Sequence, residues 1–203
     1  MDAIRQVLEA ICGAANTYLN NIDQRADPWV ALTSLVDHDG TLNPAVKDKI
    51  VMCVYNVTRE ITISTYQSAV PSGSAPSGSG PASLVVVTPP LYIDIYLMFM
   101  ANFSEKTYSD GLAALSRVIS FFQQTPYFNL DNAPGMGPDV DRVTLDFENL
   151  SPVDVNYVMG MLGTRYFPSA FYKLRMIPFV ATAMQSRTYA VTSPGTAQQG
   201  ASS

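Results

Sequence analysis

The chain has 203 residues, a length suited to one domain with tails or to one domain and a small appendage. Apolar residues make up 47% of the sequence, which predicts a substantial core. Charged residues make up only 14%, against about a quarter in typical soluble domains, so we expect part of the surface to be covered in an assembly. The net charge of -5 argues against nucleic acid as a partner, because binding phosphate requires clustered Lys and Arg.

Cysteine usage and the apolar runs bear on where the protein folds. Cys12 and Cys53 stand at apolar-patterned positions, which predicts buried free thiols rather than a disulfide framework. The first residues are amphipathic and lack the basic start and continuous apolar run of a signal peptide. The apolar stretch 84–103 contains two adjacent prolines and carries Asp94, which would cost roughly 2.5–3.5 kcal/mol in a bilayer, so we reject a membrane span. We expect a cytoplasmic protein.

The first part of the chain predicts a helix and then strands. Apolar residues recur at three- and four-residue steps over residues 2–22, which is typical of an amphipathic helix. Residues 29–36 are compatible with a short strand, and residues 49–60 with a longer one that could extend to residue 66. Between them, Asp37-His38-Asp39-Gly40 indicates a polar turn, because a calcium loop would need further oxygen ligands and a closing Glu.

The centre of the chain predicts a flexible loop followed by the main strand. Residues 68–88 include a Pro-, Gly- and Ser-rich run that holds no apolar residue larger than Ala, so little would offset the entropy of ordering it. The alternation over residues 91–103 predicts a strand with one face in a core, paired antiparallel with the strand before the loop. Its second face carries Tyr92, Asp94, Tyr96 and two methionines, and it needs a cover from a helix or another subunit.

The last part predicts two helices and two strands. Residues 108–124 form an amphipathic helix, and residues 141–149 a strand. Ser151-Pro152-Val153-Asp154 is a helix start with a cap, a proline and an acid in the first turn, and this helix should end at Gly163. A last strand is expected at 171–182. The residues expected to face inward from the first helix and strand of this part are Leu112, Leu115, Val118, Ile119, Phe122, Val143, Leu145 and Phe147.

These elements predict an α+β fold in which helices pack on a mixed β-sheet, in the order α-β-β-α-β-α-β with an optional early strand. We expect a single domain over residues 1–184 that contains the flexible loop 68–88. Residues 185–203 are small and polar, which predicts a disordered carboxy-terminal tail.

The sequence gives no positive sign of an enzyme. The only histidine has no second partner for a His-based metal site. Neither a Gly-x-Ser-x-Gly elbow nor a phosphate-binding loop with Gly-Lys-Ser/Thr occurs. We therefore predict no catalytic residues, cofactor or metal.

Interaction surfaces are the remaining candidates. One is the mixed strand face, although an ordinary core face beneath a helix explains it as well. The other is a run of aromatic and basic residues in the manner of interface anchors, which a solvated strand end explains nearly as well. The candidate interface residues are Tyr92, Asp94, Tyr96, Arg165, Tyr166, Phe167, Lys173 and Arg175.

The order of elements and several local strings resemble the terminator, or cap, proteins of contractile injection systems, which are phage-tail-like particles with an inner tube and a contractile sheath. The likeness rests on the amino-terminal helix and on the strings KIVMCVYNV, PPLYIDIYLMF, VTLDFENLSPVD and YKLRMIPF. It extends over nearly the whole chain and is to the amino-terminal-domain type of that family.

The resemblance implies a tail-terminator-like fold that assembles as a homohexamer. Such a ring would sit on the distal end of the inner tube, stop tube and sheath polymerisation and anchor the sheath. The implied partners are the tube protein and the sheath protein, and whether a second cap protein shares the task is left open. The particle would assemble in the cytoplasm and then be released or anchored to a membrane. The alternatives are a baseplate or adaptor subunit of such a particle and an unrelated small ligand-binding α/β protein.

Overall fold

A computed structural model describes residues 2–37, 39–61, 68–71, 83–87, 91–179 and 184–189 of the chain. It divides into two compact units, Met1–Ile61 with Tyr92–Pro178, and Thr62–Leu91 with Phe179–Ser203. The span 1–184, expected to be one domain, is thus shared between two units. His38, the extension of the second predicted strand to residue 66, and most of the predicted loop and tail lie outside the described residues.

A six-stranded mixed sheet forms the centre of the first unit, in the order β1-β2-β5-β8-β7-β6. β1 runs parallel to β2, whereas the pairs β2–β5, β7–β8 and β6–β7 are antiparallel. The predicted α+β class with a mixed sheet is confirmed. The strands are β1 Val30–Leu32, β2 Lys49–Arg59, β5 Leu91–Asn102, β8 Ser169–Phe179, β7 Arg142–Phe147 and β6 Tyr127–Asn129.

β5 is the strand that divides the core into two sides. It pairs with β2 from Lys49↔Asn102 to Arg59↔Ile93, with a register shift between Val54 and Asn56. Its predicted span and antiparallel pairing are therefore confirmed. Because side chains alternate along a strand, one face presents Phe99 and its neighbours to one helical layer and the other presents two methionines to the opposite side.

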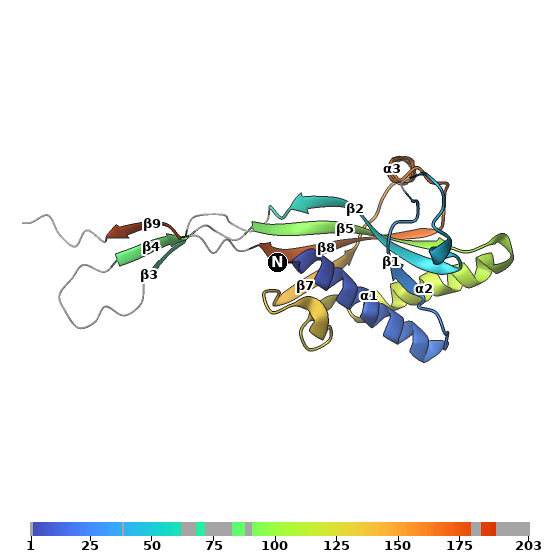
Figure 1. The fold of residues 1–203 in the computed structure, drawn as a ribbon, viewed down its shortest axis with the longest axis horizontal. Coiled ribbons are helices and arrows are strands. Elements are labelled where there is room, and N and C mark those ends of the chain that lie inside the picture. The colour runs from blue at the N-terminus through green and yellow to red at the C-terminus, as the bar shows by residue number, and fades with distance from the viewer. Residues whose placement is uncertain are drawn as a thin grey trace, which may run out of the picture. The chain divides into compact units, whose positions relative to one another are not determined.

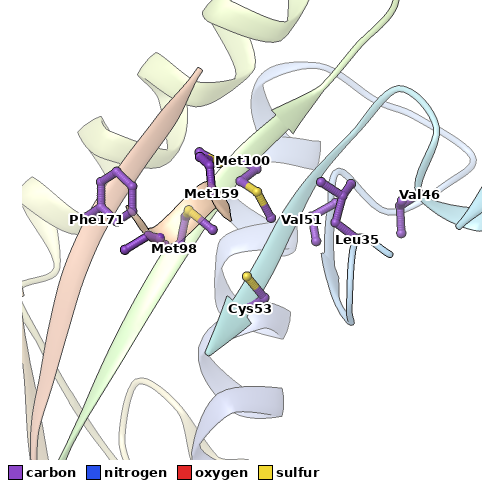
Figure 2. Packing of buried hydrophobic residues seen from close by; sticks show 9 residues of the cluster. Leu35, Val46, Val51, Cys53, Met98, Met100, Met159 and Phe171 are labelled. Carbon is purple, nitrogen blue, oxygen red and sulfur yellow. The ribbon is translucent and has the colours of Figure 1, made fainter. Parts of the chain in front are cut away.

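Helices cover both faces of the sheet, α1 and α2 on one side and α3 on the other (Figure 1). On the first side the ring of Phe99 lies 5.0 Å from that of Phe122 of α2. On the second side Met98 and Met100 share a hydrophobic cluster with Met159 of α3 (Figure 2). The helices are α1 Ala3–Ile22, α2 Tyr108–Gln124 and α3 Pro152–Met161, with short 3-10 turns η1 Pro44–Val46, η2 Glu105–Thr107 and η3 Pro134–Met136.

The buried face of α2 is rotated from the one expected. Leu112 and Ile119 are exposed, and small residues at Gly111 and Ala114 face the sheet instead. A Cβ on Gly111 would lie 2.8 Å from the ring of Phe103, so the helix approaches the end of β5 more closely than a larger residue would allow. Phe147, also expected to face inward, is exposed near the end of β7.

The second unit contains a three-stranded antiparallel sheet in the order β3-β4-β9. Its strands are β3 Ser68–Pro71, β4 Ser83–Val87 and β9 Met184–Tyr189. These strands fall within or beside the segments expected to be a flexible loop (68–88) and a disordered tail (from 185), where no strands were predicted. β9 is mostly polar and pairs through its backbone with a strand about a hundred residues earlier, so no local hydrophobic period marks it.

Candidate assembly surfaces

The ends of α3 follow from a few local residues. Ser151 caps the helix: its Oγ accepts a hydrogen bond from the Asp154 amide at 3.2 Å, and the Asp154 carboxylate accepts one from the Ser151 amide at 3.3 Å. Pro152 is the first helical residue, and Gly163 follows the helix with a φ of 65° that suits glycine. The predicted start and end of this helix are confirmed.

The inner face of α3 belongs to the core. Val158 and Met159 are buried and cluster with Met98, Met100 and Phe171, which project from β5 and β8. Figure 2 shows Met159 beside the two methionines of β5. The mixed face of β5 was expected to be covered either by a helix or by another subunit. At this end of the strand the cover is a helix of the same chain.

The outer face of α3 is apolar and exposed. Val153, Tyr157 and Met161 follow one another at four-residue steps, and they are 61%, 67% and 71% exposed. The only charged residue of the helix is Asp154, whose carboxylate is held in the cap. A helix that is hydrophobic all round is typical of a fully buried position. The outer face of α3 therefore has the character of a surface that another molecule covers.

A groove of about 770 Å³ runs beside this helix. Val155 and Met159 line its floor, and Arg165 and Tyr166, from the segment that leads to β8, line its rim. Tyr166 is 72% exposed, and no acidic group in the described part of the chain forms an ion pair with Arg165. The two predicted interface residues thus lie beside α3, at this groove. Phe167, the third of this run, is half-buried against the core cluster.

Farther along the same sheet face, charged side chains pair within the chain. Asp94 is 1% exposed, and its Oδ2 lies 2.9 Å from Lys173 Nζ. Glu60, also buried, accepts hydrogen bonds from Arg175 at 2.8 and 3.0 Å. These bonds raise the pKa of Lys173, through its bond to Asp94, and the pKa of Arg175, through its bond to Glu60. Removing one member of such a pair would leave an unneutralised buried charge.

Aromatic rings complete this network. Lys173 lies 5.3 Å from the centre of the Tyr96 ring, which contacts Tyr55 edge-on at 5.8 Å. Burial, with smaller contributions from Glu148 and Tyr96, raises the pKa of Tyr55 to about 12. The half-buried Tyr92 contributes its carbonyl, which accepts from the Glu60 amide at 2.9 Å. The bonds of these residues inside the unit support a structural role for this part of the predicted interface.

The three exposed residues of α3 and the pairing partner Glu60 were not among the predicted interface residues. The sequence of α3 did contain a signal, because apolar residues occur on both sides of the helix and it has no Lys, Arg or Glu. The sequence contained no signal for the pairing of Glu60, because Glu60 and Arg175 are 115 residues apart. Only the register of β2, β5 and β8 brings these two side chains together.

Metal binding, thiol chemistry and membrane insertion can each be judged from the described residues. Within the described ranges no three His, Cys, Asp or Glu side chains are placed to hold a metal ion. Cys12 and Cys53 are buried free thiols, as predicted. No helix in the same ranges has the length and apolar character needed to cross a bilayer.

The fold is that of known tube terminators. The structure is similar to a sheath/tube terminator of the extracellular contractile injection system PVC in its extended state, with a TM-score of 0.61 and 15% identity over 98% of this chain and 64% of that one. It is also similar to the tube-terminating cap of the anti-feeding prophage, with a TM-score of 0.58 and 13% identity over 94% of this chain and 59% of that one. The chain thus spans less than two thirds of each of these proteins.

The sequence defines the family. Residues 4–193 match the Pvc16 N-terminal domain, and the chain belongs to that family. The resemblance to terminators of contractile injection systems is therefore confirmed. No curated protein matches the sequence.

Proposed function

We propose that this chain is a structural cap that ends the inner tube of a contractile injection system. The observation that carries the proposal is the family match over residues 4–193, on a fold shared with two tube-terminating proteins. A cap acts by contact rather than by chemistry, so it needs surfaces and no catalytic residues. The exposed apolar face of α3 is a surface of this kind.

In this proposal the cap is a hexameric ring on the distal end of the tube. A stack of rings ends when one face of the last ring fits the tube and the other cannot accept a further ring. Closed rings are built from heterologous contacts, in which two different patches of each subunit meet. The sparse charge of the chain, 14% of its residues, is consistent with large covered surfaces.

The proposed partners are the tube protein and the sheath protein, and the ring would also anchor the sheath. One solved relative is described as a terminator of both sheath and tube, and the other as a cap of the tube. Assembly would take place in the cytoplasm, without nucleic acid and without a catalytic step.

Deleting the gene tests the proposal. Electron microscopy of particles from the deletion strain should show tubes of uncontrolled length, and the intact gene supplied in trans should restore a narrow length distribution. Tubes of normal length would contradict the cap function. An epitope-tagged chain should be found at the tube end distal to the baseplate, whereas label at the baseplate would assign the chain to the baseplate or an adaptor.

A further inference from the structure

The two outermost strands of the six-stranded sheet are short. β1 and β6 have three residues each and stand at the two ends of the strand order. An edge strand turns one row of its backbone N–H and C=O groups away from the sheet, and this row is a template for a strand of another molecule. What binds the outward groups of β1 and β6 therefore decides whether the sheets of two copies can join.

At the β1 edge, a side-chain amide stands where a further strand would lie. Asn16 Oδ1 accepts a hydrogen bond from the Val30 amide at 2.8 Å, and Asn16 Nδ2 donates to the Val30 carbonyl at 2.9 Å. A residue of an antiparallel strand makes the same two bonds with the residue opposite to it. Asn16 projects from α1, and Val30 is buried. This edge is thus closed by the amide and enclosed as well.

At the β6 edge, Tyr127 and Asn129 turn their backbone groups outward. On the inner side of the strand the Pro126 carbonyl accepts a hydrogen bond from the Leu145 amide at 2.9 Å, and Phe128 lies opposite Val143 of β7. Because the residues of an antiparallel strand bond alternately to one side and the other, the groups of positions 127 and 129 face away from β7.

A second asparagine amide binds these outward groups. Asn132 Nδ2 donates to the Tyr127 carbonyl at 3.0 Å, and Asn132 Oδ1 accepts from the Asn129 amide at 2.9 Å. A residue of a parallel strand binds a carbonyl and an amide two positions apart in this way. The Asn129 carbonyl, in turn, accepts from the Ala133 amide at 2.9 Å. The turn after β6 therefore holds three of the outward groups of the strand.

The two closures differ in their exposure. Asn16 is half-buried on a helix that packs beside its strand, so α1 blocks an approaching strand even without the amide. Asn132 is exposed, and Tyr127 is 40% exposed. The β6 edge therefore faces solvent, and its closure depends on one side chain.

We propose that Asn132 is an autoinhibitory contact, whose amide prevents a strand of a second copy of this chain from adding to the β6 edge. The strand that it excludes is the same edge of that copy, because two identical edges can pair about a twofold axis. The sheet of each copy then ends within that copy, and contacts between copies are left to side-chain surfaces. This inference does not rest on the proposed cap function.

Cross-linking at the β6 edge tests the proposal. Tyr127→Cys is made in the full chain, where the native cysteines are buried, and it keeps the backbone carbonyl that Asn132 binds. Residues opposite each other on paired strands have Cβ atoms about 4.5–5.5 Å apart, so a short thiol-to-thiol cross-linker reports the pairing. Adding Asn132→Ala should raise the yield of linked dimer about tenfold, because it frees the edge. Adding Asn149→Ala, at an exposed position in the loop before α3, is the matched control and should leave the yield unchanged.

Hydrogen exchange shows whether the edge was opened. In the natural chain the Asn129 amide is protected by Asn132, and in Asn132→Ala it should exchange about tenfold faster. Unchanged exchange of this amide would overturn the proposal, because Asn132 would then not be the closing group. Faster exchange without more dimer would also overturn it, because an open edge would not accept a strand. Efficient linking of Tyr127→Cys with Asn132 in place would overturn it too.

Two further variants separate edge opening from loss of structure. Asn132→Ser has a single side-chain oxygen that cannot bind both groups, so it should raise the dimer yield less than Asn132→Ala does. If Asn132→Ala does not fold, as judged by circular dichroism, a folded Asn132→Ser without more dimer than the Asn149→Ala control overturns the proposal. Asn16→Ala should lower the melting temperature, because it leaves buried backbone groups unbonded, and should not raise linking at position 127. Equal linking in Asn16→Ala and Asn132→Ala would assign the dimer to a loosened fold and overturn the proposal.

Discussion

The helices α1 and α3 lie on opposite faces of one sheet, and they differ in what they show to solvent. α1 buries an apolar stripe and carries Arg5 and Glu9 on its exposed side, where Arg5 also pairs with Asp2 at 3.1 Å. α3 buries one apolar side and exposes another, through Tyr157 and Met161 among others. The apolar stripe of α1 is thus buried by contacts within the chain, and its exposed side is charged. α3 makes its inner contacts within the chain and leaves an apolar outer face exposed. A surface helix of a finished core is amphipathic, so the apolar outer face of α3 is the one expected of a helix that also faces an assembly partner.

The largest expected effect comes from the charged network on the α3 side of the sheet. Asp94→Lys would remove the partner of Lys173 and place a second cation beside it in a buried position. We expect the free energy of unfolding to fall by about 3–5 kcal/mol, as for a broken buried ion pair. Chemical denaturation followed by circular dichroism would measure it.

A paired replacement controls for the chemistry of this site. Replacing Asp94 and Lys173 together by Leu should cost much less than Asp94→Lys, because no unneutralised charge is left behind. Unchanged stability of Asp94→Lys would mean that this sheet face is open to water and that the carboxylate at position 94 is not enclosed.

A matched pair of truncations compares the two helices themselves. Ile11 of α1 is 0% exposed, and Met161 of α3 is 71% exposed. Ile11→Ala should lower the free energy of unfolding by about 2–5 kcal/mol, because it leaves a cavity in the core. Met161→Ala should change it by no more than about 0.5 kcal/mol, as is usual for surface positions.

Self-association should respond in the opposite way to these two truncations. Met161→Ala should weaken association, because the residue lies on the exposed apolar side of α3, whereas any Ile11→Ala protein that remains folded should associate normally. Ultracentrifugation at a temperature where both variants are folded would compare them. Normal association of Met161→Ala would remove the distinction between the two helices.

The parts of the fold that could be predicted are those with a local physical cause. The span of β5 follows from its alternation, and the ends of α3 follow from Ser151, Pro152 and Gly163, whose roles depend only on the backbone nearby. The rotation of α2 could not be predicted, because it depends on how closely Gly111 approaches Phe103, the residue that follows β5. β9 could not be predicted either, because its sequence shows no hydrophobic period and the strand forms by pairing with the distant β4.

The predicted interface residues likewise fall into two groups, one exposed at the groove and one held in ion pairs inside the unit. Arg165 and Tyr166 could be found by their residue types and lie at the groove, whereas Asp94, Lys173 and Arg175 have the same types and are held in pairs inside the unit. Residue type alone does not separate these two cases, since burial of Asp94 and Glu60 depends on the register of strands distant in sequence.

The smallest expected effect uses the two native cysteines as reporters of the two helices. Cys12 belongs to the buried side of α1, and Cys53 shares the core cluster with Val158 and Met159 of α3. Burial raises the pKa of both thiols, that of Cys53 from 9.0 to about 11. The native state therefore holds the Cys53 proton more tightly than the unfolded chain does. Its contribution to stability is complete below about pH 9 and is lost as the pH rises to about 11.

Thiol labelling at pH 8 in the free subunit should consequently be slow at both positions, with Cys53 reacting before Cys12. Cys53 lines a cavity of about 230 Å³ near the end of α3, so a local opening of that helix suffices to admit the reagent. Assembly should slow labelling of Cys53 more than that of Cys12, because a neighbouring subunit would hold α3 in place. Mass spectrometry of each cysteine peptide over time gives both rates. Faster labelling of Cys12 would mean that α1, despite its charged outer side, is the less firmly held of the two helices.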